Sequence, residues 1–312
     1  MTALICGSFA YDTIMVYSGR FKNEILPDKV HMLNVSFLVP EMRREFGGCA
    51  GNIAYNLNLL GGDGKPMGTV GKDFAAYGAW MDEQGIARDH LKQVEDVFTA
   101  QAYITTDLDD NQITAFHPGA MNHAHEQRVP ADGGISLGIV SPDGRDAMLQ
   151  HAEQFAEAGI PFIFDPGQGL PMFNGTELKR FVELASYIAV NDYESEMLLD
   201  RTGLTLAQVT AQVQACIVTS GPRGSRIHTA EGSVDVPAAQ PHALADPTGC
   251  GDAYRAGLIY GLQQGLDWAT TGRIASLMGA LKIERPGTQN HEFTRDEFAE
   301  RYEMAFGTAL NW

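Results

Sequence analysis

The sequence predicts an α/β fold: a doubly wound, mostly parallel sheet with a smaller antiparallel sheet inserted into it. Two observations carry this prediction. From Ile135 onwards, short apolar segments alternate with segments of helical pattern, which is typical of a parallel sheet covered by helices on both faces. Between residues 98 and 117, two alternating, β-branched segments are joined by an Asp/Asn-rich turn, which indicates a β-hairpin.

Composition limits the class of protein and its partners. The chain has 312 residues, of which 44% are hydrophobic, enough for one large core. Its net charge of -17 disfavours nucleic acid and anionic membranes as partners, because an acidic chain repels polyanions. The 4 cysteines form no C-x-x-C pair and no Cys/His cluster, which indicates a reduced, cytoplasmic protein without a structural zinc. No apolar segment is long enough for a membrane span, and the N-terminal segment lacks a signal-peptide pattern.

The first apolar segment, Ala3–Phe9, predicts a buried strand. Ser8 and Asp12 stand at its carboxyl end, the edge where ligands bind in open parallel sheets, although Asp12 suits a turn equally well. Residues 13–45 read as the first half of an insertion, with one strand at Val35–Val39, which would join the hairpin in a β-sheet lid. We therefore expect an α/β body at 1–11, 46–97 and 119–312, and a lid at 12–45 and 98–118.

A Gly-rich segment, Phe46–Gly62, predicts a tight turn followed by a helix at Ala50–Leu60. Gly48 allows a ligand to approach the backbone closely, and Asn52 offers an amide in the first helical turn. The alternative is a helix that packs closely through its small residues. The adjacent glycines and the polar Asn together favour a substrate loop.

The segment Lys65–Gly78 predicts a strand, a turn and a helix capped by Asp73. Neither nucleotide-binding motif fits it. Residues 64–66 lack the Ser or Thr of a P-loop, and Pro66 would block the helix that must follow. The spacing of Gly68 and Gly71 does not match the dinucleotide fingerprint. We therefore interpret this segment as structural.

The second half of the chain supplies the alternating strands and helices of the main sheet. Strands are predicted at Ile135–Val140, Pro161–Phe164, Tyr187–Val190 and Cys216–Thr219, and helices at Asp143–Ala158, Thr176–Ala185, Asp192–Asp200, Leu206–Gln214, Trp268–Ile283 and Thr294–Phe306. Polar or Gly-containing junctions follow the strands at 165–168, 191–194 and 219–224. These junctions should meet at the sheet edge that carries Ser8.

One junction holds a candidate metal site. Asn191 and Glu194 lie three residues apart at a strand-to-helix turn. One amide and one carboxylate do not bind a metal alone, but they could hold Mg²⁺ through its waters while phosphates complete the shell. The alternative is a helix cap around Asp192.

The segment Ala245–Gly257, ADPTGCGDAYRAG, is the strongest candidate for a catalytic site. Its residues 246–252, here called the Gly-rich loop, lead into an apolar helix expected at Ala253–Gln264. Free N–H groups and the helix dipole make such a loop a site for anions, and Asp252 could take a proton from an attacking hydroxyl. An anion site beside a base indicates phosphoryl transfer. The local pattern fits a capped helix with turn glycines equally well.

These motifs resemble those of the ribokinase-like (PfkB) kinases, and within them the bacterial adenosine-kinase branch. The resemblance covers nearly the whole chain and rests on FGGCAGN at 46–52, TVGKDFAAYG at 69–78, the Asn191–Glu194 pair, TSGPRG at 219–224 and DPTGCGDAYRAG at 246–257. The D-x-T-G-x-G-D pattern in the last of these is a family signature. GRF at 19–21, SFLV at 36–39, FHPGAM at 116–121 and PGTQ at 286–289 are more similar to adenosine kinases than to sugar kinases.

The resemblance implies a three-layer α/β/α domain with a β-sheet lid, in which the 5′-hydroxyl of adenosine attacks the γ-phosphate of ATP to give AMP and ADP, a step of purine salvage. Asp252 would be the general base, and Gly249, Cys250 and Gly251 would donate N–H groups to the developing charge. The nucleoside would contact Ser8, Asp12, Ser36, Phe37, Gly48, Asn52, Phe116 and Gln168. ATP would lie against Asn191, Thr219, Gly221, Gly224, Thr248, Gly287 and Gln289.

The resemblance also implies ions and partners. Mg²⁺ would be organised by Glu194 through water, and K⁺, to which family members often respond, would lie near Asp246 and Thr248. The expected partners are a nucleoside and ATP. The only protein partner suggested is a second copy of the chain, in a homodimer. Two departures, Gly169 in place of a second Gln and Ala102 in place of an aromatic residue, lie where the base would bind. These departures leave open a kinase that also accepts inosine or guanosine. A sugar kinase of the same superfamily and a non-catalytic nucleoside-binding protein are the other two alternatives.

Overall fold

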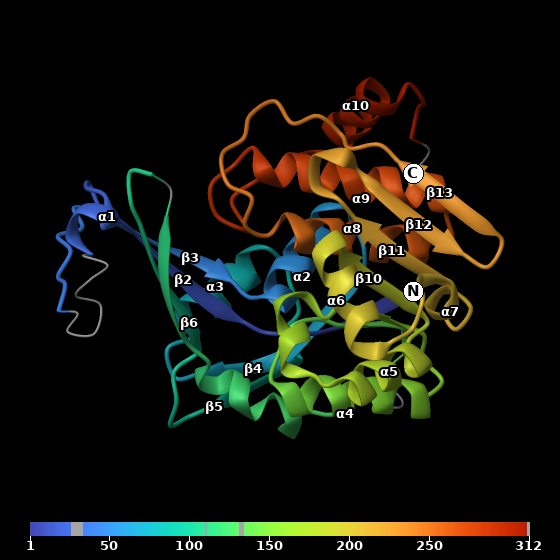
Figure 1. Ribbon diagram of the computed structural model, residues 1–312, viewed down its shortest axis with the longest axis horizontal. Helices are drawn as coiled ribbons and strands as arrows, with labels where there is room; N and C mark the ends of the chain where they lie inside the picture. Colours follow the sequence, from blue (N-terminus) through green and yellow to red (C-terminus); the bar gives the residue numbers. More distant parts are fainter. Residues whose placement is uncertain (26–33, 110, 131–133, 311–312) are drawn as a thin grey trace.

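Two β-sheets organise the chain, which the computed structural model describes over residues 1–25, 34–109, 111–130 and 134–310 (Figure 1). The larger is a 9-stranded sheet of order β13-β12-β11-β10-β9-β8-β1-β4-β5, and the smaller is a 4-stranded sheet of order β3-β2-β6-β7. The strands are β1 Thr2–Cys6, β2 Ala10–Val16, β3 Glu41–Gly47, β4 Gly64–Gly71, β5 His90–Val94, β6 Ala100–Thr106, β7 Gln112–His117, β8 Ile135–Val140, β9 Phe162–Phe164, β10 Tyr187–Asn191, β11 Ala215–Thr219, β12 Ser225–Thr229 and β13 Gly232–Val236.

Helices cover both faces of the larger sheet and make the predicted three layers. One layer contains α2 Cys49–Leu59, α3 Ala75–Glu83, α8 Cys250–Gln264 and α9 Trp268–Ile283, with α10 Arg295–Phe306 packed outside α9. The other contains α4 Arg145–Glu157, α5 Gly175–Leu184, α6 Asp192–Thr202 and α7 Leu206–Thr210, with the 3-10 helices η2 Gly119–Glu126 and η3 Gly167–Met172. The short helix α1 Phe21–Glu24 follows β2 at the outer end of the smaller sheet (Figure 1).

Alternate residues of the central strand β1 point into two different cores. Ala3 and Ile5 pack in the core beneath α2 and α8, whereas Leu4 and Cys6 pack in the core beneath α4 and α5. From β5 across to β11, all neighbouring strands are parallel, and only β12 and β13 pair antiparallel at the far edge. A sheet buried on both faces reads as continuous apolar runs, which is why the sequence predicts the bounds of β8 correctly.

The strand order reverses beside β1, since the chain pairs β1 with β4 on one side and with β8 on the other. Ligands of open α/β sheets bind in the crevice outside the carboxyl ends of the strands at such a reversal. The residues after β1, β9, β10 and β11 all lie at this edge because these strands run parallel. The prediction that the polar junctions meet on one edge is thus confirmed.

The smaller sheet extends away from the body, in blue and green in Figure 1. Its hairpin, β6 and β7, is antiparallel as predicted, and Asp107 closes the turn by accepting N–H groups from Asp109 and Asn111. Every residue of β7 is exposed, as are the first four residues of β3. The edge strands β3 and β7 are thus mostly exposed, whereas the inner strands β2 and β6 each begin with buried residues.

The predicted strand at Val35–Val39 is wrong, because residues 34–39 form no strand. The third lid strand is instead β3, which begins immediately after Pro40, a residue that cannot donate a ladder hydrogen bond. The sequence of β3, EMRREFG, has no apolar alternation since most of the strand faces solvent. Its pattern therefore gave no strand signal.

The predicted N-cap at Asp73 is also wrong. The N-cap of α3 is Phe74, and the carboxylate of Asp73 accepts hydrogen bonds from the Thr99 N–H at 2.8 Å and the Gln101 amide at 3.0 Å. The helix predicted at Leu206–Gln214 ends early, at Thr210, and α8 begins at Cys250 rather than at Ala253. The strands β2, β5, β12 and β13 were not predicted. None of the helices in the described ranges is long and apolar enough to cross a membrane.

Candidate active site

The Gly-rich loop ends at the N-terminus of α8, at the ligand-binding edge of the large sheet. Gly249 is the N-cap residue, with a φ of 80°, a conformation that a side chain would disfavour. No side chain caps the helix, so its first N–H groups remain available to a ligand. The N–H of Cys250 donates to the Pro247 carbonyl at 3.2 Å, whereas a Cβ on Gly251 would meet no atom within 4 Å. The space in front of Gly251 is thus open to an anion.

Asp252 stands in the first turn of α8 and is fixed by a residue 200 positions earlier in the chain. Asn52, in the first turn of α2, donates its side-chain N–H to Asp252 Oδ2 at 2.8 Å. Burial raises the pKa of Asp252 to about 7, against the Asn52 hydrogen bond, which lowers it. A carboxyl group with a pKa near 7 exchanges protons readily at neutral pH, as a general base must.

Gln289, predicted to contact ATP, lies instead behind Asn52. It is 2% exposed, and its Nε2 donates to Asn52 Oδ1 at 3.0 Å and to the Tyr77 hydroxyl at 2.7 Å. The indole N–H of Trp80 donates to Gln289 Oε1 at 3.0 Å, and the Tyr77 hydroxyl donates to the Gly47 carbonyl. Because an indole can only donate, this chain of hydrogen bonds fixes which atom of each amide faces its neighbour. It presents the N–H of Asn52 to Asp252.

Three predicted substrate residues meet where β1 leads into β2. The Ser8 hydroxyl accepts the N–H of Cys49 at 3.2 Å, and the Ser8 carbonyl accepts the N–H of Ala50 at 3.0 Å. Gly48 has a φ of 89°, and a Cβ there would lie 2.5 Å from the Ser8 carbonyl, so only glycine fits. The Asp12 carboxylate lies against Gly47, and burial raises its pKa to about 6, helped by Asp246 and Glu45.

The residues predicted to hold K⁺ already have protein partners. Asp246 accepts the N–H of Thr248 at one carboxylate oxygen and that of Gly287 at the other, both at 2.9 Å. Its backbone carbonyl accepts a hydrogen bond from the Lys282 ammonium at 2.7 Å. Burial lowers the pKa of Lys282, and the negative charge of Asp246 opposes this effect. Lys282 was not predicted as a site residue, although a lysine in the apolar run LMGALKI indicates a buried charge that needs partners.

A buried ion pair that was not predicted from the sequence lies beneath Asp252. Arg255, one turn along α8, forms an ion pair with Asp165 at 3.0 Å, and both side chains are 6% exposed. The guanidinium also donates to the Ala189 carbonyl at 3.1 Å. Asp165 raises the pKa of Asp252 and Arg255 lowers it, so the pair contributes to the protonation behaviour of the base. An arginine within the apolar start of α8 was the available signal.

At β10, Asn191 is the N-cap of α6, and it forms a capping box with Glu194. Both oxygens of Glu194 are engaged: one accepts the Asn191 backbone N–H at 2.9 Å and the other its amide at 2.8 Å. Burial raises the pKa of Glu194. The helix cap that was the alternative to a metal site is therefore present, but the capping residue is Asn191 rather than Asp192. Each oxygen still has lone pairs for a metal-bound water, so the donor set fits Mg²⁺ in its hydrated form.

The turn after β11 carries the remaining residues predicted to border ATP. The Thr219 hydroxyl donates to the Val190 carbonyl at 3.4 Å, and Gly221 and Gly224 have positive φ values of 54° and 90°. A Cβ on Gly221 would meet no atom within 4 Å, so this backbone is open on the same edge as the Gly-rich loop. Arg223 forms an ion pair with Asp192.

Five residues are predicted to line the base pocket. Ser8 follows β1, whereas Ser36, Phe37, Phe116 and Gln168 are not brought together by direct contacts. Phe37 packs against Tyr17 and Phe21, with ring centroids 4.9 and 5.0 Å apart. Phe116 is 54% exposed on β7, and Ser36 and Gln168 are exposed as well. These residues form a site only if a ligand or a movement of the lid draws them together.

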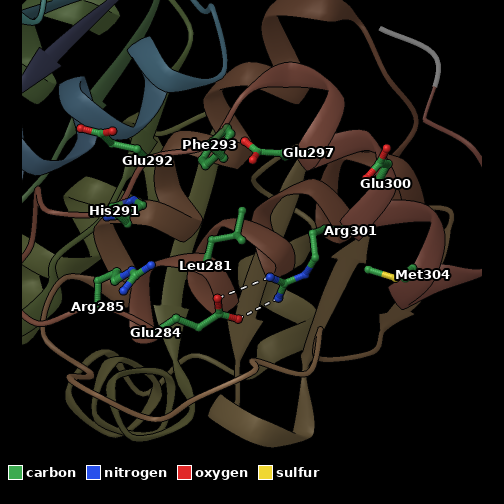
Figure 2. Close-up of a pocket in the computed structure, with 10 residues that line it drawn as sticks. All are labelled: Leu281, Glu284, Arg285, His291, Glu292, Phe293, Glu297, Glu300, Arg301 and Met304. Atoms are coloured by element: carbon green, nitrogen blue, oxygen red, sulfur yellow. Dashed lines mark hydrogen bonds and ion pairs between the residues drawn. The ribbon is translucent and has the colours of Figure 1, made fainter.

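A cavity of about 280 Å³ lies away from these residues, between the segment after α9 and helix α10 (Figure 2). Its walls carry the Glu284–Arg301 ion pair, with N and O atoms 2.7 Å apart. It also contacts His291, whose Nε2 hydrogen-bonds to Asn56 at 2.8 Å. None of the residues that line it belongs to the predicted site, and the Asp252 cluster therefore remains the candidate active site.

Comparisons with known proteins agree with this geometry. The chain matches the model of the pfkB family carbohydrate kinases over residues 9–295. A nucleoside kinase of Burkholderia thailandensis, solved in complex with inosine, is 53% identical and superposes with a TM-score of 0.91, covering 99% of this chain and 100% of that one. Its structure in complex with ADP-inosine superposes with a TM-score of 0.87 at 55% identity, covering 99% of this chain and 97% of that one.

The similarity extends to archaeal relatives. A nucleoside kinase of Methanocaldococcus jannaschii is 31% identical over 272 residues, which cover 86% of this chain and 89% of the archaeal protein. The match to the family model, over residues 9–295, includes both the Gly-rich loop and the helix that carries Asn52. The resemblance noted in the motifs at 46–52 and 246–257 is thus confirmed, and the chain belongs to the pfkB family of carbohydrate kinases, phosphotransferases whose acceptor is a hydroxyl group.

Proposed function

We propose that the protein is an ATP-dependent purine nucleoside kinase that phosphorylates the 5′-hydroxyl of adenosine, and of inosine and guanosine. The observation that carries this proposal is the position of Asp252, a half-buried carboxylate fixed by Asn52 beside the open backbone of Gly251. A relative that is 53% identical was solved with inosine, which supports a purine nucleoside as the acceptor. The reaction would take place in the cytoplasm.

In the proposed reaction, the Asp252 carboxylate takes the proton of the 5′-hydroxyl as that oxygen attacks the γ-phosphorus of ATP. The bond between the γ-phosphorus and the bridging oxygen breaks, and ADP leaves with its negative charge. The N–H groups of Gly249 and Gly251, and the positive end of the α8 dipole, stabilise the charge on the transferred group. Cys250 contributes less because its N–H already donates to Pro247.

ATP would lie along the edge formed by the turns after β10 and β11 and by the Gly-rich loop. The open backbone of Gly221 supports this placement, with Thr219, Gly224, Thr248 and Gly287 alongside. Asn191 and Glu194 would hold Mg²⁺ through its water molecules. When bound, Mg²⁺ neutralises charge on the phosphates.

The nucleoside would bind between the body and the lid, residues 12–45 and 98–118. Asp12, Gly48 and Asn52 would receive the ribose hydroxyls, and Ser8 would line the base pocket. The convergence of Ser8, Asp12 and Gly48 where the chain passes from β1 into the lid supports this proposal. Closure of the lid would bring Ser36, Phe37 and Phe116 towards Gln168 around the base. Gly169 and Ala102 leave this region with small side chains, which favours acceptance of more than one purine.

A panel of acceptors tests the proposal. The protein is assayed for ADP formation from ATP with adenosine, inosine, guanosine, ribose and fructose, and ³¹P NMR identifies the phosphorylated position. We expect kcat/KM for a purine nucleoside to exceed that for either sugar by at least about tenfold. ADP formation with the sugars alone would instead identify a sugar kinase. Binding of nucleosides without ADP formation would identify a non-catalytic binding protein.

A further inference from the structure

Lys282 is a buried cation whose partners are backbone carbonyl groups. Its exposure is 0%, and its Nζ donates to the carbonyl oxygens of Asp246 at 2.7 Å and Arg285 at 3.3 Å. A buried ammonium group is costly unless its N–H groups are paired. Over the described part of the chain, no carboxylate lies within ion-pair distance of Nζ. The N–H groups of the ammonium are instead paired with backbone carbonyl oxygens.

These carbonyls belong to the two segments that hold the Gly-rich loop in place. Asp246 begins the loop, and Arg285 follows α9. The same segments are joined by hydrogen bonds from Ala245 N–H to the Ile283 carbonyl at 2.8 Å and from Gly287 N–H to Asp246 Oδ2 at 2.9 Å. Lys282 stands in the last turn of α9, where the helix dipole favours a cation. Its ammonium therefore ties the start of the loop to the end of this helix.

The position of this ammonium conflicts with a monovalent metal cation at Asp246 and Thr248. Carbonyl oxygens that converge on one point are the ligands that K⁺ uses in proteins. Here the Asp246 carbonyl is held by Lys282, and both Asp246 carboxylate oxygens accept backbone N–H groups. A K⁺ ion at the same carbonyls would stand against a fixed positive charge. The residues present therefore do not fit K⁺.

We infer that the Lys282 ammonium takes the place of a monovalent cation behind the Gly-rich loop, so that phosphoryl transfer by this protein needs no K⁺. The hydrogen bond to the Asp246 carbonyl holds the ammonium of Lys282 at the start of the loop, and its charge acts on Asp246, Cys250 and Asp252. In a chain with a net charge of -17, a built-in cation at this point favours phosphate binding. This inference rests on the proposed phosphoryl transfer.

The first test measures the cation dependence of the unaltered protein. ADP formation is followed with Mg²⁺, ATP and the best acceptor, in tetramethylammonium chloride and then in KCl at equal ionic strength. Since the fixed ammonium supplies the charge, kcat should change by less than about twofold between the two salts. Activation by K⁺ of about tenfold or more would overturn the inference.

The second test removes the ammonium. Lys282→Ala leaves room for a cation, whereas Lys282→Met fills the space with a neutral chain. In tetramethylammonium chloride both variants should lose roughly tenfold or more in kcat, with a smaller change in the KM of the acceptor. K⁺ or NH₄⁺ should restore Lys282→Ala and leave Lys282→Met low. Lys65→Ala, a change at the start of β4 in the body, should behave like the unaltered protein in every salt.

A binding readout separates this inference from the proposed function. The melting temperature of Lys282→Ala should rise with the concentration of K⁺ or NH₄⁺ but not of tetramethylammonium, because only ions that bind the folded state stabilise it. That result would support the inference even if no acceptor gave ADP, which would count against the kinase proposal alone. An Lys282→Ala variant that is active without K⁺ and shows no melting shift would contradict it. Should both variants fail to fold, the salt series on the unaltered protein still decides.

Discussion

The Gly-rich loop and the lid differ in how many of their functional side chains already have fixed partners. Around the loop, Asp252, Asn52, Gln289 and Lys282 are each held by hydrogen bonds to groups from other elements. In the lid, Phe116 is 54% exposed and all of β7 faces solvent. A reacting centre needs its geometry before the substrate arrives, whereas a surface that surrounds a base can form around it. In the proposed reaction, the body would therefore carry the chemistry, and the choice of base would depend on the lid.

The largest expected effect in this comparison is the loss of the base. Asp252→Asn keeps the shape of the side chain and cannot take a proton, so kcat should fall by roughly 10²–10⁴-fold while nucleoside binding stays within a few-fold. Steady-state assays and calorimetric titration with inosine measure the two quantities. Near-normal turnover would show that another group accepts the proton.

The stability of this variant supplies its control. Since the folded protein holds the Asp252 proton more tightly than the unfolded chain, the contribution of this carboxyl to stability is fully present below its ordinary pKa of 3.8 and is lost as the pH rises through about 7. Asparagine stays neutral at every pH. At pH 8, Asp252→Asn should therefore melt no lower than the unaltered protein, and a lower melting temperature would indicate damage to the fold.

The buried pair beneath the loop should matter mainly for stability. Arg255→Met leaves the Asp165 carboxylate buried without its partner, which typically costs about 3–5 kcal/mol of the free energy of unfolding. Urea denaturation measures this loss. Arg226→Met, which removes an exposed ion pair with Asp235, is the matched control and should leave the midpoint unchanged. Equal effects of the two changes would contradict the assigned role of the buried pair.

The side-chain amides of Asn52 and Gln289, which lie behind Asp252, should affect the rate of phosphoryl transfer and the pH dependence of that rate. Gln289→Glu cannot donate to Asn52 Oδ1, so Asn52 would turn its oxygen towards Asp252 and raise the pKa of that carboxyl. We expect kcat at pH 7 to fall about tenfold. Gln263→Glu, the same change at another buried glutamine, should leave kcat and its pH profile unaltered. An unchanged profile in Gln289→Glu would show that Asn52 is oriented by other contacts.

The lid should give the smallest effects. Phe116→Ala removes an exposed ring from β7, and we expect a few-fold increase in the KM of the nucleoside with little change in kcat or in melting temperature. A panel of nucleosides would show whether the increase differs between adenosine and inosine. A large fall in kcat with unchanged KM would mean that this strand belongs to the reacting centre, and the comparison between loop and lid would fail.

The difference between the body and the lid also explains which elements could be predicted from the sequence. The elements of the body, such as α9 at Trp268–Ile283 and β8 at Ile135–Val140, match their predicted bounds because they are buried and their apolar pattern is strong. The lid strand β3 was missed because its sequence, EMRREFG, has no apolar alternation, whereas the exposed strand β7, QITAFH, alternates and was predicted. The bond from Gln289 to Asn52 joins residues 237 positions apart, and no local pattern reports a contact of that kind. The sequence motifs predict the Gly-rich loop, but only the three-dimensional structure shows which side chains orient Asp252.

The pH dependence of phosphoryl transfer tests most directly whether Asp252 is a base prepared by its surroundings. Because burial raises the pKa of Asp252 in the free protein to about 7, and only the ionised carboxylate accepts a proton, kcat/KM of the nucleoside should be high at pH 8 and fall roughly tenfold per pH unit below pH 7. The pKa of ATP is the same for every variant, so the fall should begin at higher pH in Gln289→Glu. A kcat/KM that is constant from pH 5 to pH 8 would contradict the account.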